Sequence, residues 1–288
     1  MIRKNAVGFA AVLAVALVAP AMVSAQSAHQ SLGPGVSAGQ ESRAASPYHM
    51  SWTRDGLTFA AAGIGLGVAG LLSSEPDSLT EIEITALSRD QVIWFDRSAT
   101  RRYSTDLISL SEASALPLAV APVALLLDSR MRSDWATLAV MFIQTNMLSE
   151  AASSIAKEAI PRHRPYLYNT DLTYEERTDR EPGKAFFSSA ATFAFARAVF
   201  LGTVYSDHHP ESSLRPYVWG AALTTAATAS YLRYASGIHY PSDVVVGAAV
   251  GAAIGHLVPR LHRADESAFT VAPSTVGDGV GLSVQFTF

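Results

Sequence analysis

The chain has no cysteine, which excludes a disulfide framework, a thiolate nucleophile and a cysteine-ligated zinc site. It is also poor in charge: Asp, Glu, Lys and Arg make up 16% of its 288 residues, against roughly a quarter in an average soluble domain. No group of His, Asp and Glu has the spacing of a zinc site. We therefore expect neither a metal nor a cofactor.

Runs of Lys and Arg are missing as well, and the net charge is -4, so the sequence offers no positive surface for nucleic acid. Hydrophobic residues, in contrast, make up 49% of the chain, enough to bury one substantial core. The mean hydropathy of +0.20 lies between that of a soluble protein and that of a multispanning one. These features favour one large domain in contact with a membrane.

The N-terminus resembles an export signal. Arg3 and Lys4 precede an apolar run over residues 6–19, and small residues end at Ala25. We predict a signal peptide over residues 1–25, with an uncleaved anchor helix as the alternative, and a flexible linker over residues 26–50. The predicted location is the periplasm or cell envelope, in association with a membrane.

Residues 51–262 alternate apolar blocks with polar loops. This pattern predicts an all-α domain, an antiparallel bundle of about six helices. The block lengths fit lipid-facing spans or a dimeric soluble bundle, and both readings stay open. Glycines at every fourth position of the last block predict close packing of two helices. The predicted helices are Leu57–Leu72, Ala115–Leu127, Trp135–Ile160, Ala190–Tyr205, Tyr217–Ala235 and Ser242–Val258.

Residues 263–288 have a different hydrophobic periodicity from the helical blocks. Val280, Leu282 and Val284 alternate with small or polar residues after a Gly-Asp-Gly sequence at 277–279. Alternation around such a turn predicts a β-hairpin. An isolated hairpin is only marginally stable in water, so we expect this one to lean on the bundle, a membrane or a partner.

Polar residues gather at the predicted helix ends. In an up-and-down bundle the exits of the third and fifth helices and the entries of the fourth and sixth lie at one pole. Two helix N-termini at that pole point N–H groups and partial positive charge at one place. We therefore predict an oxyanion cradle that suits phosphate. The residues expected there are Lys157, Arg164, Ser188, Arg233, His239 and Asp243.

These residues resemble the motifs of the superfamily of type 2 phosphatidic acid phosphatases and vanadium haloperoxidases. The first motif, K-x6-RP, is complete at Lys157, Arg164 and Pro165. The third, SR-x5-H-x3-D, is present at Arg233, His239 and Asp243, with Leu232 in place of the serine. The middle motif, PSGH, is degenerate: it reads Phe187, Ser188, Ser189 and Ala190, so the family's histidine is replaced by alanine.

The resemblance implies a role for each residue. His239 would attack phosphorus and form a phosphohistidine, and Asp243 would fix the tautomer of its ring. The phosphate oxygens would be held by Lys157, Arg164, Arg233 and the backbone N–H groups near Ser188 and Ser189. The family's general acid is missing at Ala190, a loss that typically costs about 10² to 10⁴ in rate.

Three functions follow from this resemblance. The favoured one is an enzyme, a phosphatase acting on a lipid phosphate, a pyrophosphate or a small phosphate ester. The first alternative is a pseudoenzyme that binds phosphate-bearing ligands with little or no turnover. The second alternative is a vanadate-dependent haloperoxidase, in which His239 would ligate vanadium. His163, beside Arg164, is a further candidate for the missing proton donor.

Overall fold

We describe the protein from a computed structural model, which describes residues 46–73, 79–178, 182–263, 269–276 and 279–286. The predicted signal peptide, residues 1–25, and the greater part of the predicted linker lie outside these residues. The predicted hairpin turn at residues 277–279 lies mostly outside them too.

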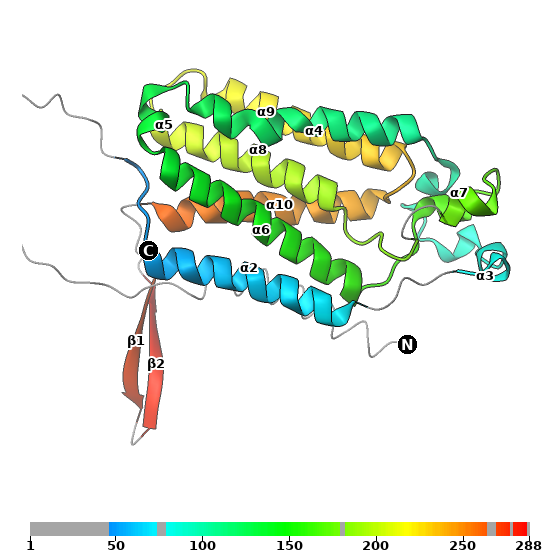
Figure 1. Ribbon diagram of the computed structural model, residues 1–288, viewed down its shortest axis with the longest axis horizontal. Coiled ribbons are helices and arrows are strands. Elements are labelled where there is room, and N and C mark those ends of the chain that lie inside the picture. The colour runs from blue at the N-terminus through cyan, green and yellow to red at the C-terminus, as the bar shows by residue number, and fades with distance from the viewer. Residues whose placement is uncertain (1–45, 74–78, 179–181, 264–268, 277–278, 287–288) are drawn as a thin grey trace, which may run out of the picture.

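The domain is helical, which confirms the predicted all-α class (Figure 1). Six long helices form the bundle, and three short ones, α3 (Glu81–Thr85), α5 (Ser129–Ser133) and α7 (Tyr174–Thr178), lie in the described connections. Strands β1 (Phe269–Val276) and β2 (Gly279–Phe286) pair antiparallel, with Phe269 opposite Phe286. The long helices are α2 (Trp52–Leu72), α4 (Thr105–Leu125), α6 (Trp135–Ala159), α8 (Ser189–His208), α9 (Arg215–Ala235) and α10 (Pro241–His262).

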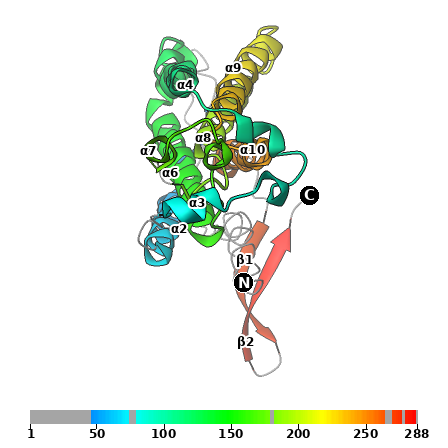
Figure 2. The same cartoon turned by 90° about the vertical axis from the view of Figure 1, so that its right-hand side faces the viewer.

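Helices that follow one another in sequence run in opposite directions through the bundle (Figure 1). The closest pair, α8 and α10, runs parallel, because α9 carries the chain back between them. Their N-termini therefore lie side by side at the pole that also holds the ends of α6 and α9. Figure 2, which views the bundle from this pole, shows α3 and α7 in front of the helix ends.

Two predicted boundaries need correction. Helix α4 begins ten residues before the predicted Ala115, because the Ser104 side chain accepts a hydrogen bond from Leu107 N and caps the helix. The polar first half of α4 also has a tertiary partner, since Ser111 Oγ donates to Ala229 O on α9. The predicted linker, residues 26–50, ends inside the domain: Tyr48 is buried and its hydroxyl donates to Asp207 on α8.

The glycines of α10 produce the close contact with α8, as their spacing predicted. A Cβ atom on Gly251 would lie 2.1 Å from Thr192 O, and one on Gly255 would lie 2.2 Å from Ala196 O. These contacts advance by four residues on both helices, which is the register of a parallel pair. The two N-termini can approach each other because no side chain separates the helices.

We expect Gly251→Ala to destabilise the protein by about 1–3 kcal/mol, because the added methyl group must push α8 and α10 apart. Thermal unfolding in a fixed detergent measures this effect. Gly63→Ala on α2 is the matched control, because a Cβ there meets nothing within 4 Å. Equal unfolding temperatures for the two variants would contradict the packing described here.

Candidate functional site

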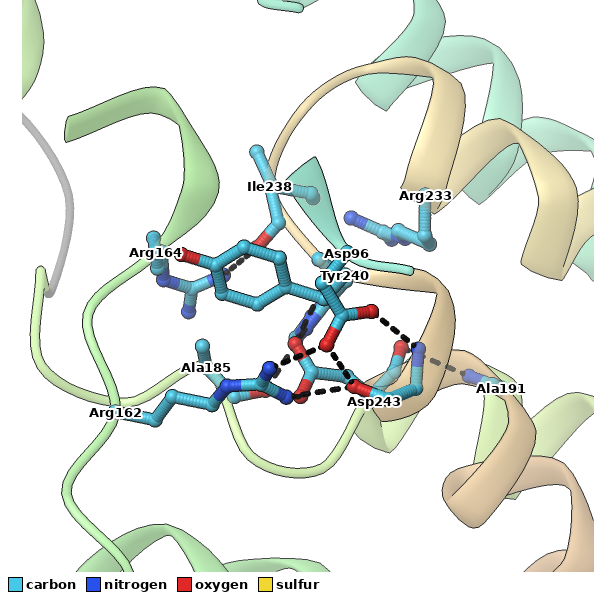
Figure 3. A network of polar contacts seen from close by, with 12 residues as sticks. Asp96, Arg162, Arg164, Ala185, Ala191, Arg233, Ile238, Tyr240 and Asp243 are labelled. Atoms are coloured by element: carbon cyan, nitrogen blue, oxygen red, sulfur yellow. Dashed lines mark hydrogen bonds and ion pairs between the residues drawn. The ribbon is translucent and has the colours of Figure 1, made fainter. Parts of the chain in front are cut away.

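Four segments distant in sequence join at the pole where α6 and α9 end and α8 and α10 begin. Ser188 N, just before α8, donates to Asp243 O in the first turn of α10 at 3.1 Å. Tyr166 N, after α6, donates to Gly237 O, after α9, at 3.1 Å. Figure 3 shows the polar side chains that these connections bring together. The predicted convergence of helix ends is thus present in the fold.

His239 lies in the short turn between α9 and α10 and is buried, with 5% of its surface exposed. Its Nδ1 atom lies 2.9 Å from Ala185 O and 3.7 Å from Asp243 Oδ2. A carbonyl oxygen and a carboxylate oxygen only accept hydrogen bonds, so Nδ1 carries the proton. The lone pair of the neutral ring is therefore on Nε2, the nitrogen that a nucleophilic role requires.

The pKa of His239 is lowered from its usual 6.5 to about 4. Burial is the largest cause, because it disfavours the charged ring. The Asp243 carboxylate acts in the opposite direction, whereas the positive charges of Arg164 and Lys157 lower the pKa further. His239 is consequently neutral at pH 7 and needs to lose no proton before it attacks an electrophile.

This lowered pKa predicts an activity profile. Above pH about 4 the Nε2 lone pair is available, and below it the ring is protonated. If His239 is the nucleophile, we expect the acid limb of kcat/KM near pH 4. Lys157→Met removes a charge that lowers the pKa, so its acid limb should move to higher pH. Measuring both profiles on one substrate cancels the ionisation of the substrate. Coincident profiles with an acid limb near 6.5 would contradict the prediction.

The two cations of the first motif flank His239. Lys157 is in the last turn of α6, and Arg164 lies after Pro161 in the segment that follows this helix. The Arg164 Nη1 atom donates to Ile238 O at 3.2 Å, which fixes the guanidinium beside the residue that precedes His239. Both charges act on the pKa of the imidazole. The structure thus brings Lys157, Arg164 and His239 together.

Asp243 is completely buried at the start of α10. Its Oδ2 atom accepts from Tyr240 N at 2.9 Å, and its Oδ1 atom accepts from Arg162 Nη1. The carboxylate lies one helical turn from His239, as predicted. Its direct contact with His239 Nδ1, at 3.7 Å, is longer than a hydrogen bond, so Ala185 O is the nearer acceptor.

At the N-terminus of α8, Ser188 forms the cap. Its Oγ atom accepts from Ala191 N at 3.4 Å, and its own N–H donates to Asp243 O. Ser188 therefore ties α8 to α10 instead of offering its N–H to a ligand. The next two residues, Ser189 and Ala190, are the first two of the helix, where N–H groups have no partner within the helix.

Arg233 lies in the last turn of α9, and its Nη2 atom donates to Glu112 on α4 at 3.2 Å. In Figure 3 Arg233 and Arg164 lie on opposite sides of Ile238. Glu112 is an exposed carboxylate that competes with any anionic ligand for the guanidinium of Arg233. A ligand that binds Arg233 would therefore have to share the guanidinium with Glu112 or replace that carboxylate.

Sequence reasoning missed two residues of the site, Arg162 and Asp96. Arg162 occupies a variable position of the first motif, and its guanidinium pairs with both Asp96 and Asp243. Asp96 is completely buried, although it belongs to the polar segment between α3 and α4. A buried carboxylate needs a partner, but its partner is 66 residues away along the chain, so no local pattern could reveal it.

A cleft of about 510 Å³ lies beside this network. Its lining combines exposed apolar side chains, Ile93 and Phe95, with Arg162 and His163. His163 lines this cleft, whereas the Arg164 guanidinium donates to Ile238 O, beside His239.

Fold and site together define a helical-bundle protein with a neutral, buried histidine next to two cationic side chains. Residues 134–266 match the family model of the PAP2 superfamily, the superfamily that the motifs of this chain resemble. A solved transmembrane PAP2-type phosphatidylglycerolphosphate phosphatase from Bacillus subtilis is 17% identical, with a TM-score of 0.43, over 72% of this chain and 94% of that one. No curated protein matches the chain.

Proposed function

We propose that the protein is a phosphatase that hydrolyses a lipid phosphate or pyrophosphate, or a small phosphate ester, through a phosphohistidine. The observation that carries this proposal is His239 itself. Its Nδ1 proton faces Ala185 O, and its ring is neutral at pH 7. The positive charges of Lys157 and Arg164 lower the pKa of the ring. A neutral imidazole with a free Nε2 beside fixed positive charge suits attack on an anionic phosphorus centre.

In the first step Nε2 of His239 forms a bond to phosphorus while the bond from phosphorus to the leaving oxygen breaks. The leaving oxygen keeps the bonding electron pair and takes a proton from solvent, because Ala190 cannot supply one. The ring then carries a positive charge, which the Asp243 carboxylate stabilises through the ring's Nδ1–H side. Lys157 and Arg164, with the N–H groups of Ser189 and Ala190, would hold the equatorial oxygens. In the second step water attacks phosphorus, the bond to Nε2 breaks, and inorganic phosphate leaves.

A lipid substrate is supported by the surface of the bundle. Within the described part of the chain, three helices, α2, α4 and α10, are long and apolar enough to cross a membrane. Large apolar side chains are exposed along α2 and α4, and exposed aromatic residues gather near both ends of the bundle. Such aromatic belts mark the two interfaces of a bilayer. The exposed aromatic residues are Trp52, Trp135 and Tyr217 near one end, and Trp94, Phe95, Tyr174 and Tyr231 near the other.

This surface supports membrane association. We further propose that residues 1–25 export the protein and that the site works at the exported face of the membrane, in the periplasm or cell envelope. The pole that carries His239 also carries Trp94 and Phe95, so a lipid headgroup at the interface would lie at the depth of the site. Membrane fractionation with a carbonate wash tests the association independently of activity.

A second candidate is a pseudoenzyme that binds phosphate-bearing ligands but turns them over poorly. Two observations favour it: Ala190 stands at the position of the family's proton donor, and Arg233 is paired with Glu112. Both features weaken turnover more than they weaken capture of an anion by Lys157 and Arg164. The same experiment separates the two candidates.

The test is release of inorganic phosphate from phosphatidate and from a pyrophosphate lipid in mixed micelles by the purified full-length protein. Phosphate release with a single-turnover intermediate that is stable to base and labile to acid supports the phosphohistidine enzyme. Binding of vanadate or phosphate without release supports the pseudoenzyme. Neither release nor anion binding would overturn both candidates.

A further inference from the structure

The guanidinium of Arg162 joins two buried carboxylates that come from different parts of the chain. Its Nη2 atom lies 2.6 Å from Asp96 Oδ2, and its Nη1 atom pairs with Asp243 Oδ1 (Figure 3). The side chains of Asp96 and Asp243 are 1% and 0% exposed, whereas that of Arg162 is 26% exposed. The guanidinium also stacks over the Tyr240 ring, 4.1 Å from its centroid. Such a fork geometry suits arginine and not lysine.

The backbone of Arg162 positions the other acceptor near His239. Arg162 N donates to Gly183 O at 2.8 Å, and Arg162 O accepts from Ala185 N at 3.0 Å. These two backbone hydrogen bonds hold residues 183–185 in place. Ala185 O is the acceptor that lies 2.9 Å from His239 Nδ1. Both acceptors that face Nδ1, the carbonyl of Ala185 and the carboxylate of Asp243, are thus held by one residue.

Asp96 in turn fixes Arg162 to the start of α10. Its Oδ1 atom accepts from Ser242 N at 3.0 Å, and its Oδ2 atom accepts from Ser242 Oγ at 2.6 Å. A carboxylate at these positions satisfies an N–H group of the first helical turn and is favoured by the helix dipole. Asp96 therefore caps α10 from another segment, while it also pairs with the cation that orients Asp243.

We propose that Asp96 and Arg162 are positioning residues for the nucleophile: Asp96 holds Arg162, and Arg162 holds Asp243 and Ala185 so that the His239 proton stays on Nδ1. This inference rests on the proposed function. Asp96 lies outside residues 134–266, the segment that matches the PAP2 family model. The segment between α3 and α4 accordingly completes the site of the family domain.

Asp96→Asn is the decisive substitution. The amide keeps an oxygen acceptor for Ser242 N but turns a donor NH₂ group toward the Arg162 guanidinium, which then loses one of its two anionic partners. We expect kcat to fall about 10- to 100-fold, because small misplacements of a reacting group have effects of that size. KM should change little, since Asp96 does not contact substrate. Arg162→Lys should lower kcat similarly, because an ammonium cannot bridge both carboxylates.

A double-mutant cycle separates positioning from simple stabilisation. If Asp96 acts through Asp243, then adding Asp96→Asn to an Asp243→Asn variant should lower kcat no further. Multiplicative losses in the double variant would overturn the proposal. So would an Asp96→Asn variant that melts at a lower temperature yet keeps the wild-type kcat per folded molecule.

The tautomer of His239 can be measured by NMR without any catalytic turnover. In protein labelled with ¹⁵N-histidine, the His239 signals are those absent from His239→Asn. We expect Nδ1 to be protonated and Nε2 to be unprotonated in the wild type, and Asp96→Asn to shift both signals toward those of a ring exchanging between tautomers. Unchanged signals would overturn the proposal. If the wild type releases no phosphate, the proposed function fails, and these signals still decide the role of Asp96.

Asp90→Asn is the matched control. Asp90 belongs to the same segment, but its side chain is 92% exposed and lies 3.9 Å from Arg97, its partner in a loose ion pair. An exposed pair of this kind contributes little to stability. The control variant should therefore keep the kcat and the His239 signals of the wild type, and a loss equal to that of Asp96→Asn would overturn the proposal.

Discussion

Replacing His239 with asparagine is expected to reduce phosphate release by more than about 10³-fold, because the substitution removes the atom that forms the bond to phosphorus. Asparagine suits this test better than alanine. Its side-chain NH₂ group lies close to the position of Nδ1 and can donate to Ala185 O, so the buried acceptor keeps a partner. The loss then reports the missing Nε2 and not a disturbed loop.

The measurement is single-turnover phosphate release, together with detection of the phosphorylated protein. His256→Asn is the control, since His256 is an exposed residue of α10 far along the helix from His239. We expect the control to keep both the rate and the intermediate. A His239→Asn protein that folds and still forms a phosphoprotein would contradict the proposed nucleophile.

Replacing Ala190 with histidine is expected to raise the rate by about 10² to 10⁴ on substrates with a poor leaving group, because it restores a proton donor in the middle motif. The effect should depend on the leaving oxygen. An alkoxide, as in a lipid phosphate, needs a proton when it leaves, whereas a nitrophenolate leaves without one. The wild type should accordingly be slow on phosphatidate and comparatively fast on p-nitrophenyl phosphate.

The position of residue 190 affects this donor. It is the second residue of α8, where the helix dipole disfavours a positive charge. The pKa of a histidine there should therefore be lowered, and the gain in rate should be largest at mildly acidic pH. A rate measured from pH 5 to 8 on both substrates tests this dependence.

Ala190→Gln serves as the matched control, because glutamine adds a similar polar volume but cannot transfer a proton as an acid. It should leave the rates on both substrates near those of the wild type. Equal gains for the glutamine and histidine variants, or equal gains on both substrates, would contradict general-acid rescue. They would indicate instead that position 190 acts through ligand binding.

The helical class and the six long helices could be predicted because their signals are local. Apolar blocks separated by polar loops are recognised from composition and period alone. The start of α4 escaped prediction, because its first half is polar. That half is helical because Ser104 caps it and Ser111 bonds to α9, and the second of these contacts is tertiary.

The same division applies to the candidate site. Lys157, Arg164, His239 and Asp243 could be named from motif spacing, and their helix ends do meet at one pole. The partners of Ser188 and Arg233 could not, because both residues bond across the bundle, to Asp243 O and to Glu112. The spacing of a motif shows which residue types occur together. It does not show which other groups in the fold form hydrogen bonds or ion pairs with those residues.

By itself the sequence determined the helical class, the superfamily of residues 134–266 and the residue that attacks in the proposed reaction. These properties depend on residue type and on separations of a few residues, which can be read from the sequence without knowledge of the tertiary structure. Only the tertiary structure decided the protonated nitrogen of His239 and the link from Asp96 through Arg162 to Asp243. The physical reason is that hydrogen bonding and burial act between groups far apart in sequence, and their strength depends on ångström distances that no spacing encodes.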